Sequence, residues 1–178
     1  PEIITISGLP GSGKSTVSKI LAEKLSYKYL SVGSLFRSLA EKNGDNLLIF
    51  SKKAEVDFGI DQKVDKLMLE ASFRDKPLII EGRIAPWILK RNSVKSFNIY
   101  LGGAMFLRVK RIAGRENVDY KVAFAQTKDR ENSERERYKR IYDIDVNDKS
   151  VYDLVIINGY LTINQIVEKI LKRLVKNN

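Results

Sequence analysis

The chain has 178 residues, a length at which a single domain buries a full hydrophobic core. Its formal net charge of +10 favours an anionic partner such as nucleic acid, a membrane surface or a phosphorylated small molecule. The absence of Cys and His excludes disulfides, thiolate metal sites and imidazole catalysis, so any metal ion must be held by oxygen ligands, which suits Mg²⁺. Neither a membrane-length apolar run nor a charged-then-apolar leader is recognisable, so we expect a cytoplasmic protein.

Apolar, β-prone runs alternate with helical stretches along the chain. We expect strands at Ile3–Ser7, Tyr27–Ser31, Leu78–Glu81, Phe97–Leu101 and Leu154–Ile157. We expect helices at Ser15–Leu25, Ser34–Glu41, Leu47–Ala54, Gln62–Phe73, Ala104–Ala113, Lys121–Tyr142 and Ile163–Leu174. This alternation predicts a three-layer α/β/α fold with a central five-stranded parallel sheet, whose ligands bind at the carboxyl ends of the strands.

The first strand leads into residues 8–16, which read GLPGSGKST and complete the pattern G-x-x-x-x-G-K-[ST] of a phosphate-binding loop. Glycines let backbone N–H groups turn inward around an anion, and the following helix adds the positive end of its dipole. Lys14 is suited to the β- and γ-phosphates of a nucleoside triphosphate, and the Ser15 hydroxyl to Mg²⁺. The alternative is a Gly-rich strand-to-helix turn that binds nothing.

The second strand is followed by SVGSLFR, residues 31–37. Here Ser34 is a candidate helix N-cap, and Arg37 projects from the first turn with a planar fork that suits a phosphate. The alternative is a capped helix with a solvated Arg.

The third strand ends in Glu81-Gly82-Arg83. The carboxylate can hold a Mg²⁺-bound water, Gly82 lets the backbone approach a ligand, and Arg83 offers a second phosphate clamp. The alternative is an ordinary ion pair at the end of a strand.

Arginines gather in the second half of the chain. Arg108, Arg111 and Arg115 share one face of a helix, and the stretch 128–140, KDRENSERERYKR, holds more Arg than Lys. Bidentate phosphate contacts explain this bias better than solubility does, so we interpret the stretch as a mobile arginine-bearing cover rather than a solvated hairpin. Phosphoryl transfer needs positioned phosphates, excluded water and positive charge, so the lack of His is no obstacle.

These residues together resemble the nucleoside monophosphate kinases, and most closely the archaeal type of cytidylate kinase. The stretches that carry the resemblance are ISGLPGSGKST, YLSVGSLFR, IEGR, RVKRIAGRE, RENSERERYKRIYDIDVND and YDLVI, spread from residue 4 to residue 157. The resemblance implies a P-loop NTPase fold and Mg²⁺-dependent transfer of a phosphoryl group from ATP to CMP or dCMP. It also implies one domain with a core (1–46, 74–119 and 143–178), an acceptor-binding segment near 47–73 and a lid near 120–142.

The residue chemistry and the resemblance together give expected roles for individual residues. The expected catalytic residues are Lys14, Arg130 and Arg137. The expected ATP ligands are Gly8, Leu9, Pro10, Gly11, Ser12, Gly13, Lys14, Ser15, Thr16, Arg111, Arg115, Asn158 and Gly159. The expected CMP ligands are Ser31, Gly33, Phe36, Arg37, Asp57, Asp61, Glu81, Gly82 and Arg83. Ser15 is expected to bind Mg²⁺ directly and Glu81 through water, in a monomer without nucleic acid or membrane partners.

The residue that reads the acceptor base stays open. A carboxylate prefers cytosine to uracil because it accepts a hydrogen bond from the exocyclic amine, and Asp57, Asp61 and Asp65 all lie in the expected acceptor segment. Bacterial cytidylate kinases read Asp-Ser-Gly and Asp-Gly-Arg where this chain has Ser31-Val32-Gly33 and Glu81-Gly82-Arg83, so their base-reading residues do not transfer.

Two other functions compete with this interpretation. The first is a kinase of another small acceptor, such as UMP or another monophosphate, or a shikimate-like compound. The second is an ATPase that binds nucleic acid, which the net charge and the Arg-rich stretch motivate.

Overall fold

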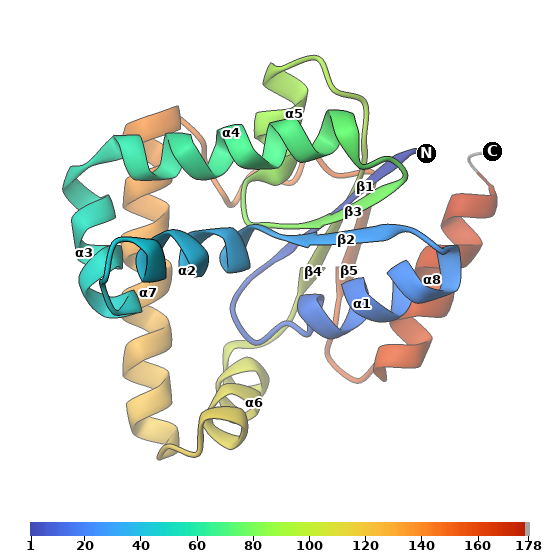
Figure 1. Cartoon of the computed structure of the whole chain (residues 1–178). Helices are drawn as coiled ribbons and strands as arrows, with labels where there is room; N and C mark the ends of the chain where they lie inside the picture. The colour runs from blue at the N-terminus through green and yellow to red at the C-terminus, as the bar shows by residue number, and fades with distance from the viewer. Residues whose placement is uncertain (177–178) are drawn as a thin grey trace.

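A computed structural model describes residues 1–176, apart from the side chains of residues 47 and 48. Five strands form one parallel sheet in the order β2-β3-β1-β4-β5 (Figure 1). They are β1 (Ile3–Gly8), β2 (Lys28–Ser31), β3 (Leu78–Glu81), β4 (Phe97–Gly102) and β5 (Leu154–Ile157). The three-layer architecture and the five-stranded parallel sheet expected from the alternation are confirmed.

Helices cover both faces of the sheet because its inner strands are apolar on both faces. Ile4 and Ile6 of β1 face α1 (Lys14–Leu25) and α8 (Ile163–Val175), whereas Ile3 faces the opposite side. On that side lie α4 (Phe58–Arg74) and α5 (Ala85–Arg91), together with Tyr138. The result is two hydrophobic cores that hold the carboxyl ends of the strands at one edge of the molecule.

Four further elements surround that edge (Figure 1). The helices α2 (Val32–Lys42) and α3 (Leu47–Val56) pack with α4 around a small core that includes Phe50 and Ile60. The helices α6 (Met105–Glu116) and α7 (Tyr120–Tyr142) pack on each other through Val109, Ile112 and Ala123. The long helix α7 therefore reaches from α6 to the α2–α4 group.

The structure corrects three local expectations. The N-cap of α2 is Ser31, whose hydroxyl accepts from the Ser34 N–H at 3.3 Å, so Ser34 is inside the helix. The helix expected from Gln62 begins four residues earlier, because Asp57 caps it at Gly59 N. The seven-residue helix α5 was not expected. Across residues 1–176, no helix combines the length and the apolar character that a membrane crossing requires.

Candidate active site

The phosphate loop joins β1 to α1 and is shaped by glycines at which a side chain would clash or strain the backbone. A Cβ on Gly8 would lie 2.2 Å from the Leu101 carbonyl oxygen, and one on Gly11 would lie 2.5 Å from that of Arg108. Gly11 and Gly13 also have φ values of +75° and +87°, in the region that L side chains rarely adopt. The loop is therefore a close-fitting backbone turn at the start of α1.

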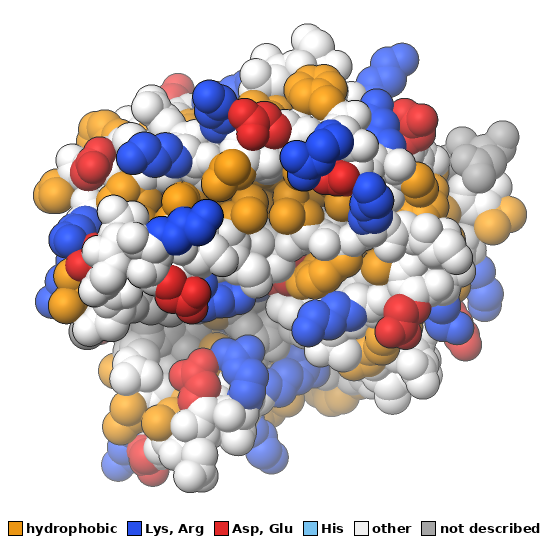
Figure 2. Space-filling view, in the orientation of Figure 1, with side chains coloured by type: hydrophobic (Ala, Val, Ile, Leu, Met, Phe, Trp, Pro, Cys, Tyr) orange, Lys and Arg blue, Asp and Glu red, His pale blue; other side chains and the backbone are white. Residues whose placement is uncertain are grey.

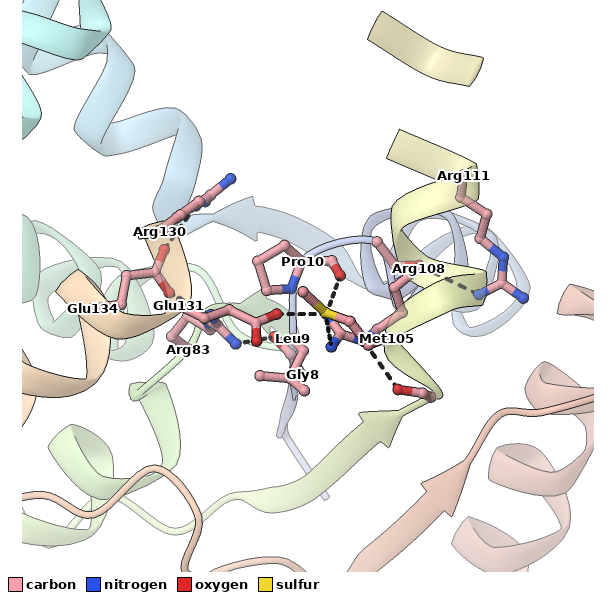
Figure 3. Close-up of polar contacts among 12 residues, drawn as sticks. Gly8, Leu9, Pro10, Arg83, Met105, Arg108, Arg111, Arg130, Glu131 and Glu134 are labelled. Carbon is pink, nitrogen blue, oxygen red and sulfur yellow. Dashed lines mark hydrogen bonds and ion pairs between the residues drawn. The ribbon is translucent and has the colours of Figure 1, made fainter. Parts of the chain in front are cut away.

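Cationic side chains surround this turn from several elements. Four consecutive carbonyl oxygens, from Gly8 to Gly11, each accept a hydrogen bond from a different cation. In order along the loop, the donors are Arg83 (3.0 Å), Lys14 (3.5 Å), Arg108 (2.9 Å) and Arg111 (3.3 Å). Figure 3 shows the three arginines converging on the loop from β3's end and from α6. This positive charge suits a polyphosphate.

The space-filling view shows that the molecule is hollowed on this side. In Figure 2 a recess lies between the α6–α7 part at the lower left and the α2–α3 part above it, with Lys and Arg side chains at its rim. The expected phosphate loop therefore opens beside a basic recess, as a site for charged ligands requires.

The surroundings of Lys14 disfavour its protonated form. Burial, and after it the nearby Arg83, lower the pKa of its ammonium from 10.5 to about 8, while Glu81 and Glu134 act in the opposite direction. Lys14 is thus protonated at neutral pH but lacks enough negative charge around it. A phosphate placed there would supply that charge.

Oxygen ligands stand next to the loop. The Ser15 hydroxyl donates to Glu81 Oε1 at 2.8 Å, and the Tyr29 hydroxyl donates to Glu81 Oε2 at 2.5 Å. Burial, followed by the contact with Glu81, raises the pKa of Tyr29. Mg²⁺ in kinases takes one or two protein oxygens and completes its shell with waters and phosphates, so Ser15 and Glu81 fit such an ion.

A carboxylate of α7 links two of the arginines at the site. Glu134 Oε2 accepts from Arg83 at 2.5 Å, and Glu134 Oε1 accepts from Arg130 Nε at 2.8 Å (Figure 3). Burial by itself would raise the pKa of Glu134, but Arg83 and Arg130 outweigh it and hold the pKa at about 2. Glu134 is therefore ionised, and it occupies the guanidinium fork of Arg83, which was expected to bind a phosphate.

The helix α7 also contacts the α2–α4 group. Arg137 Nε lies 3.2 Å from Asp61 Oδ2, and both side chains are only 10% exposed. The same guanidinium lies over the rings of Phe36, at 6.0 Å, and Tyr138, at 5.3 Å. Burial raises the pKa of Asp61, Arg137 lowers it and Glu134 raises it. The expected lid and acceptor segments thus meet at a buried ion pair.

Two further expected ligands, Arg37 and Arg115, have different hydrogen-bond partners. Arg37 donates to the Ser34 hydroxyl at 2.8 Å, and its charge opposes the rise in the pKa of Tyr29. Arg115 instead pairs with Glu116 at 2.7 Å and is 65% exposed. These two arginines, both expected as ligands, are therefore held differently.

Three more expected ligands also differ in how they are held. Asp57 serves as the cap of α4 and is exposed. Asn158 is fully buried after β5, and both polar atoms of its side chain find no hydrogen-bond partner among the residues that the structure describes. Gly82 leaves no space for a Cβ, which would lie 2.8 Å from Val32 Cγ2. Asn158 is thus an unsatisfied buried amide that a ligand can complete.

Sequence reasoning missed several residues that the structure brings into the site, among them Arg108 and Glu134. Arg108 was seen to share a face with Arg111 but was not assigned a contact, and Glu134 was taken as part of a charged stretch. The only signal for Glu134 is its four-residue spacing from Arg130, which predicts an ion pair but not its burial.

The sheet, the phosphate loop at its carboxyl edge and the arginine-bearing helices define the class of phosphate-loop kinases. Solved structures with the same fold include a protein from Eubacterium ventriosum (TM-score 0.74, 23% identity, 97% of each chain). Another is the shikimate kinase from Bacteroides thetaiotaomicron (TM-score 0.67, 13% identity, 97% of this chain and 98% of that one). At these identities they show the fold alone.

Sequence comparison is more specific. The family model "Cytidylate kinase-like family" matches residues 3–160. The cytidylate kinase of Sulfurisphaera tokodaii is 44% identical over 99% of this chain and 98% of its own length. That of Methanococcus vannielii is 42% identical over 96% of this chain and 99% of its own. The chain belongs to the cytidylate kinase-like family, and the resemblance inferred from its motifs is confirmed.

Proposed function

We propose that this protein transfers the γ-phosphoryl group of ATP to CMP, and also to dCMP, in a Mg²⁺-dependent reaction that yields ADP and CDP or dCDP. The observation that carries the proposal is the convergence of the phosphate loop with Arg83, Arg130 and Glu134 at one edge of the sheet, in a chain of the cytidylate kinase-like family. Positioning and charge are what phosphoryl transfer requires of a protein.

The donor half of the site is the phosphate loop. Its backbone N–H groups and Lys14 bind the β- and γ-phosphates of ATP, whose negative charge stabilises the buried ammonium. Ser15 would hold Mg²⁺ directly and Glu81 through a water, and the ion would supply positive charge to the phosphates of ATP.

The far end of ATP lies beyond the loop, toward the segment after β5. Asn158, whose buried amide is unsatisfied, and Gly159 contact the adenine, while Arg111 and Arg115 approach the nucleotide from α6. In this role the exposed Arg115 must exchange its partner Glu116 for ATP.

The acceptor half lies between α2 and the end of β3. Arg37 and Arg83 clamp the phosphate of CMP, so the phosphate takes the place that Glu134 holds in the fork of Arg83. Arg130 and Arg137 of α7 contribute positive charge to the transferring group and help to exclude water.

Of the three candidate carboxylates, Asp61 is the best placed to read cytosine. It is buried beside Arg137 and near Phe36, which offers a ring for the base, whereas Asp57 is occupied as a helix cap. Asp65, the third carboxylate of this segment, accepts from Tyr142.

The decisive experiment is a measurement of kcat/KM for CMP, dCMP, UMP, AMP, GMP and shikimate with ATP, with Mg²⁺ and with EDTA. We expect CMP to be preferred, dCMP to be accepted, and EDTA to abolish turnover. Turnover of shikimate without turnover of CMP would overturn the proposal. We further propose that the protein is a cytoplasmic monomer that acts on free nucleotides. Light scattering tests the monomer, and RNA binding measured over a range of salt concentrations tests for a nucleic-acid partner.

A further inference from the structure

Arg108 is a buried cation at the junction of three segments. Its side chain is 3% exposed and donates to Pro10 O in the phosphate loop and to Gly103 O after β4, both at 2.9 Å. It also pairs with Glu131 of α7, since Nη1 lies 2.5 Å from Glu131 Oε1. Figure 3 shows this guanidinium between the loop and α7. A residue that joins these segments can make the conformation of the phosphate loop depend on the position of α7.

The contact with the phosphate loop fixes the orientation of a peptide unit. The Pro10 carbonyl and the Gly11 N–H belong to one planar trans peptide, so they point in opposite directions. With the carbonyl anchored on Arg108, the Gly11 N–H points to the other side of the loop. The backbone of α6 also abuts this peptide, since a Cβ on Gly11 would meet Arg108 O at 2.5 Å. Arg108 thereby presets the direction of one amide donor of the loop.

The contact with α7 gives the same guanidinium a charged partner. A buried cation that loses its carboxylate is strongly destabilised, so Arg108 is sensitive to where α7 places Glu131. The Pro10 carbonyl and the Glu131 carboxylate share one nitrogen, Nη1, as acceptors. A displacement of α7 therefore changes the hydrogen bonding of the phosphate loop.

We propose that Arg108 is a positioning residue that orients the Pro10–Gly11 peptide for the phosphates of ATP and, through Glu131, links this orientation to the position of α7. The proposal rests on the proposed function, because it takes the loop to bind ATP. Arg108 acts through the loop and not by contact with either nucleotide.

The first test compares Arg108→Lys with Lys110→Gln, which removes an exposed charge from the same helix. A lysine cannot reproduce the planar fork that serves Pro10 and Gly103, so we expect the KM for ATP to rise about tenfold while the KM for CMP changes less than about twofold. Lys110→Gln leaves both constants unchanged. Equal rises in both constants, or no rise for ATP, would overturn the positioning role.

The second test is a double-mutant cycle of Arg108→Gln and Glu131→Gln, with the KM for ATP measured at saturating CMP. We expect the double variant to be at least about threefold better than the product of the single effects, because each substitution removes the same link. Strictly multiplicative effects would refute the link to α7.

A third measurement separates this proposal from the proposed function. Titration calorimetry of ATP and Mg²⁺ into wild type and Arg108→Lys needs no acceptor, and it should show weaker binding by the variant. If wild type binds ATP but does not phosphorylate CMP, the proposed function fails while Arg108 is still tested. Equal ATP affinity of the two proteins would refute the role of Arg108 alone.

Discussion

Without added nucleotide, wild type should be less stable than a variant in which Lys14 loses its charge. Folding lowers the pKa of its ammonium from 10.5 to about 8, chiefly by burial, so the protonated side chain opposes folding. Lys14→Met keeps the aliphatic stem and removes the charge. We therefore expect this variant to unfold at a higher temperature than wild type while losing turnover by orders of magnitude.

The magnitude follows from the change in pKa. At about 1.36 kcal/mol per pKa unit, the fall from 10.5 to about 8 corresponds to about 3 kcal/mol. Lys14 is partly accessible to water, so we expect a net gain of about 2 kcal/mol, or a rise in Tm of about 4–8 °C for a domain of this size.

The pH dependence has a defined sign. Below pH 8, Lys14 is protonated in both the folded and the unfolded chain, so the full cost is present. Between pH 8 and 10.5 the folded chain releases its proton first, and the stability of wild type rises toward that of Lys14→Met. The difference between the two proteins is thus largest near pH 7 and disappears toward pH 10.5.

Urea unfolding followed by circular dichroism at pH 7 and pH 10 measures this difference. Lys19→Met on the exposed side of α1 is the matched control and should change stability by less than about 0.5 kcal/mol. Added ATP should raise the Tm of wild type but not that of Lys14→Met. A less stable Lys14→Met at pH 7, or a gain that persists unchanged at pH 10, would refute the electrostatic reasoning.

Three other substitutions test the site. Glu134→Gln should lower the free energy of unfolding by about 3 kcal/mol at pH 7, because it leaves Arg83 without its carboxylate. This loss, measured by urea unfolding, should shrink as the pH falls from 4.5 toward 2, where Glu134 of wild type becomes protonated. Asp61→Asn should lower kcat/KM for CMP by about 10- to 100-fold and reduce the preference for CMP over UMP; unchanged selectivity would exclude Asp61 as the base reader. Gly11→Ala should abolish ATP binding in calorimetry and cost about 1–3 kcal/mol, whereas Gly114→Ala, whose Cβ meets nothing within 4 Å among the described residues, should not destabilise the chain.

The sequence was sufficient for the sheet because its strands are short runs that are mostly apolar or rich in β-branched and aromatic residues, a pattern that is recognisable locally. The phosphate loop was equally clear, since its glycines satisfy local backbone requirements that the structure reproduces. The bounds of α7, Tyr120–Tyr142, coincide with the lid predicted at 120–142. Its division from the core as a lid stays a prediction.

What escaped the sequence depends on tertiary packing. The helix α5 is only seven residues long, which is too short for a helical period to emerge. Arg108 and Glu134 belong to charged stretches that by composition belong on a solvated face, yet they are 3% and 8% exposed. Their burial arises because α6 and α7 fold back over the loop, and nothing in the local pattern encodes that approach.

The charged residues beside the phosphate loop already form a pattern that a phosphate would complete. Burial lowers the pKa of Lys14 most, and repulsion from Arg83 adds to it, while Glu134, which occupies the fork of Arg83, acts in the opposite direction. A phosphate that enters must displace this carboxylate, so part of its Coulomb attraction to Arg83 is offset by the loss of Glu134. If Glu134 stands where the phosphate binds, CMP should stabilise Glu134→Gln more than it stabilises wild type, because in that variant no carboxylate competes for the clamp.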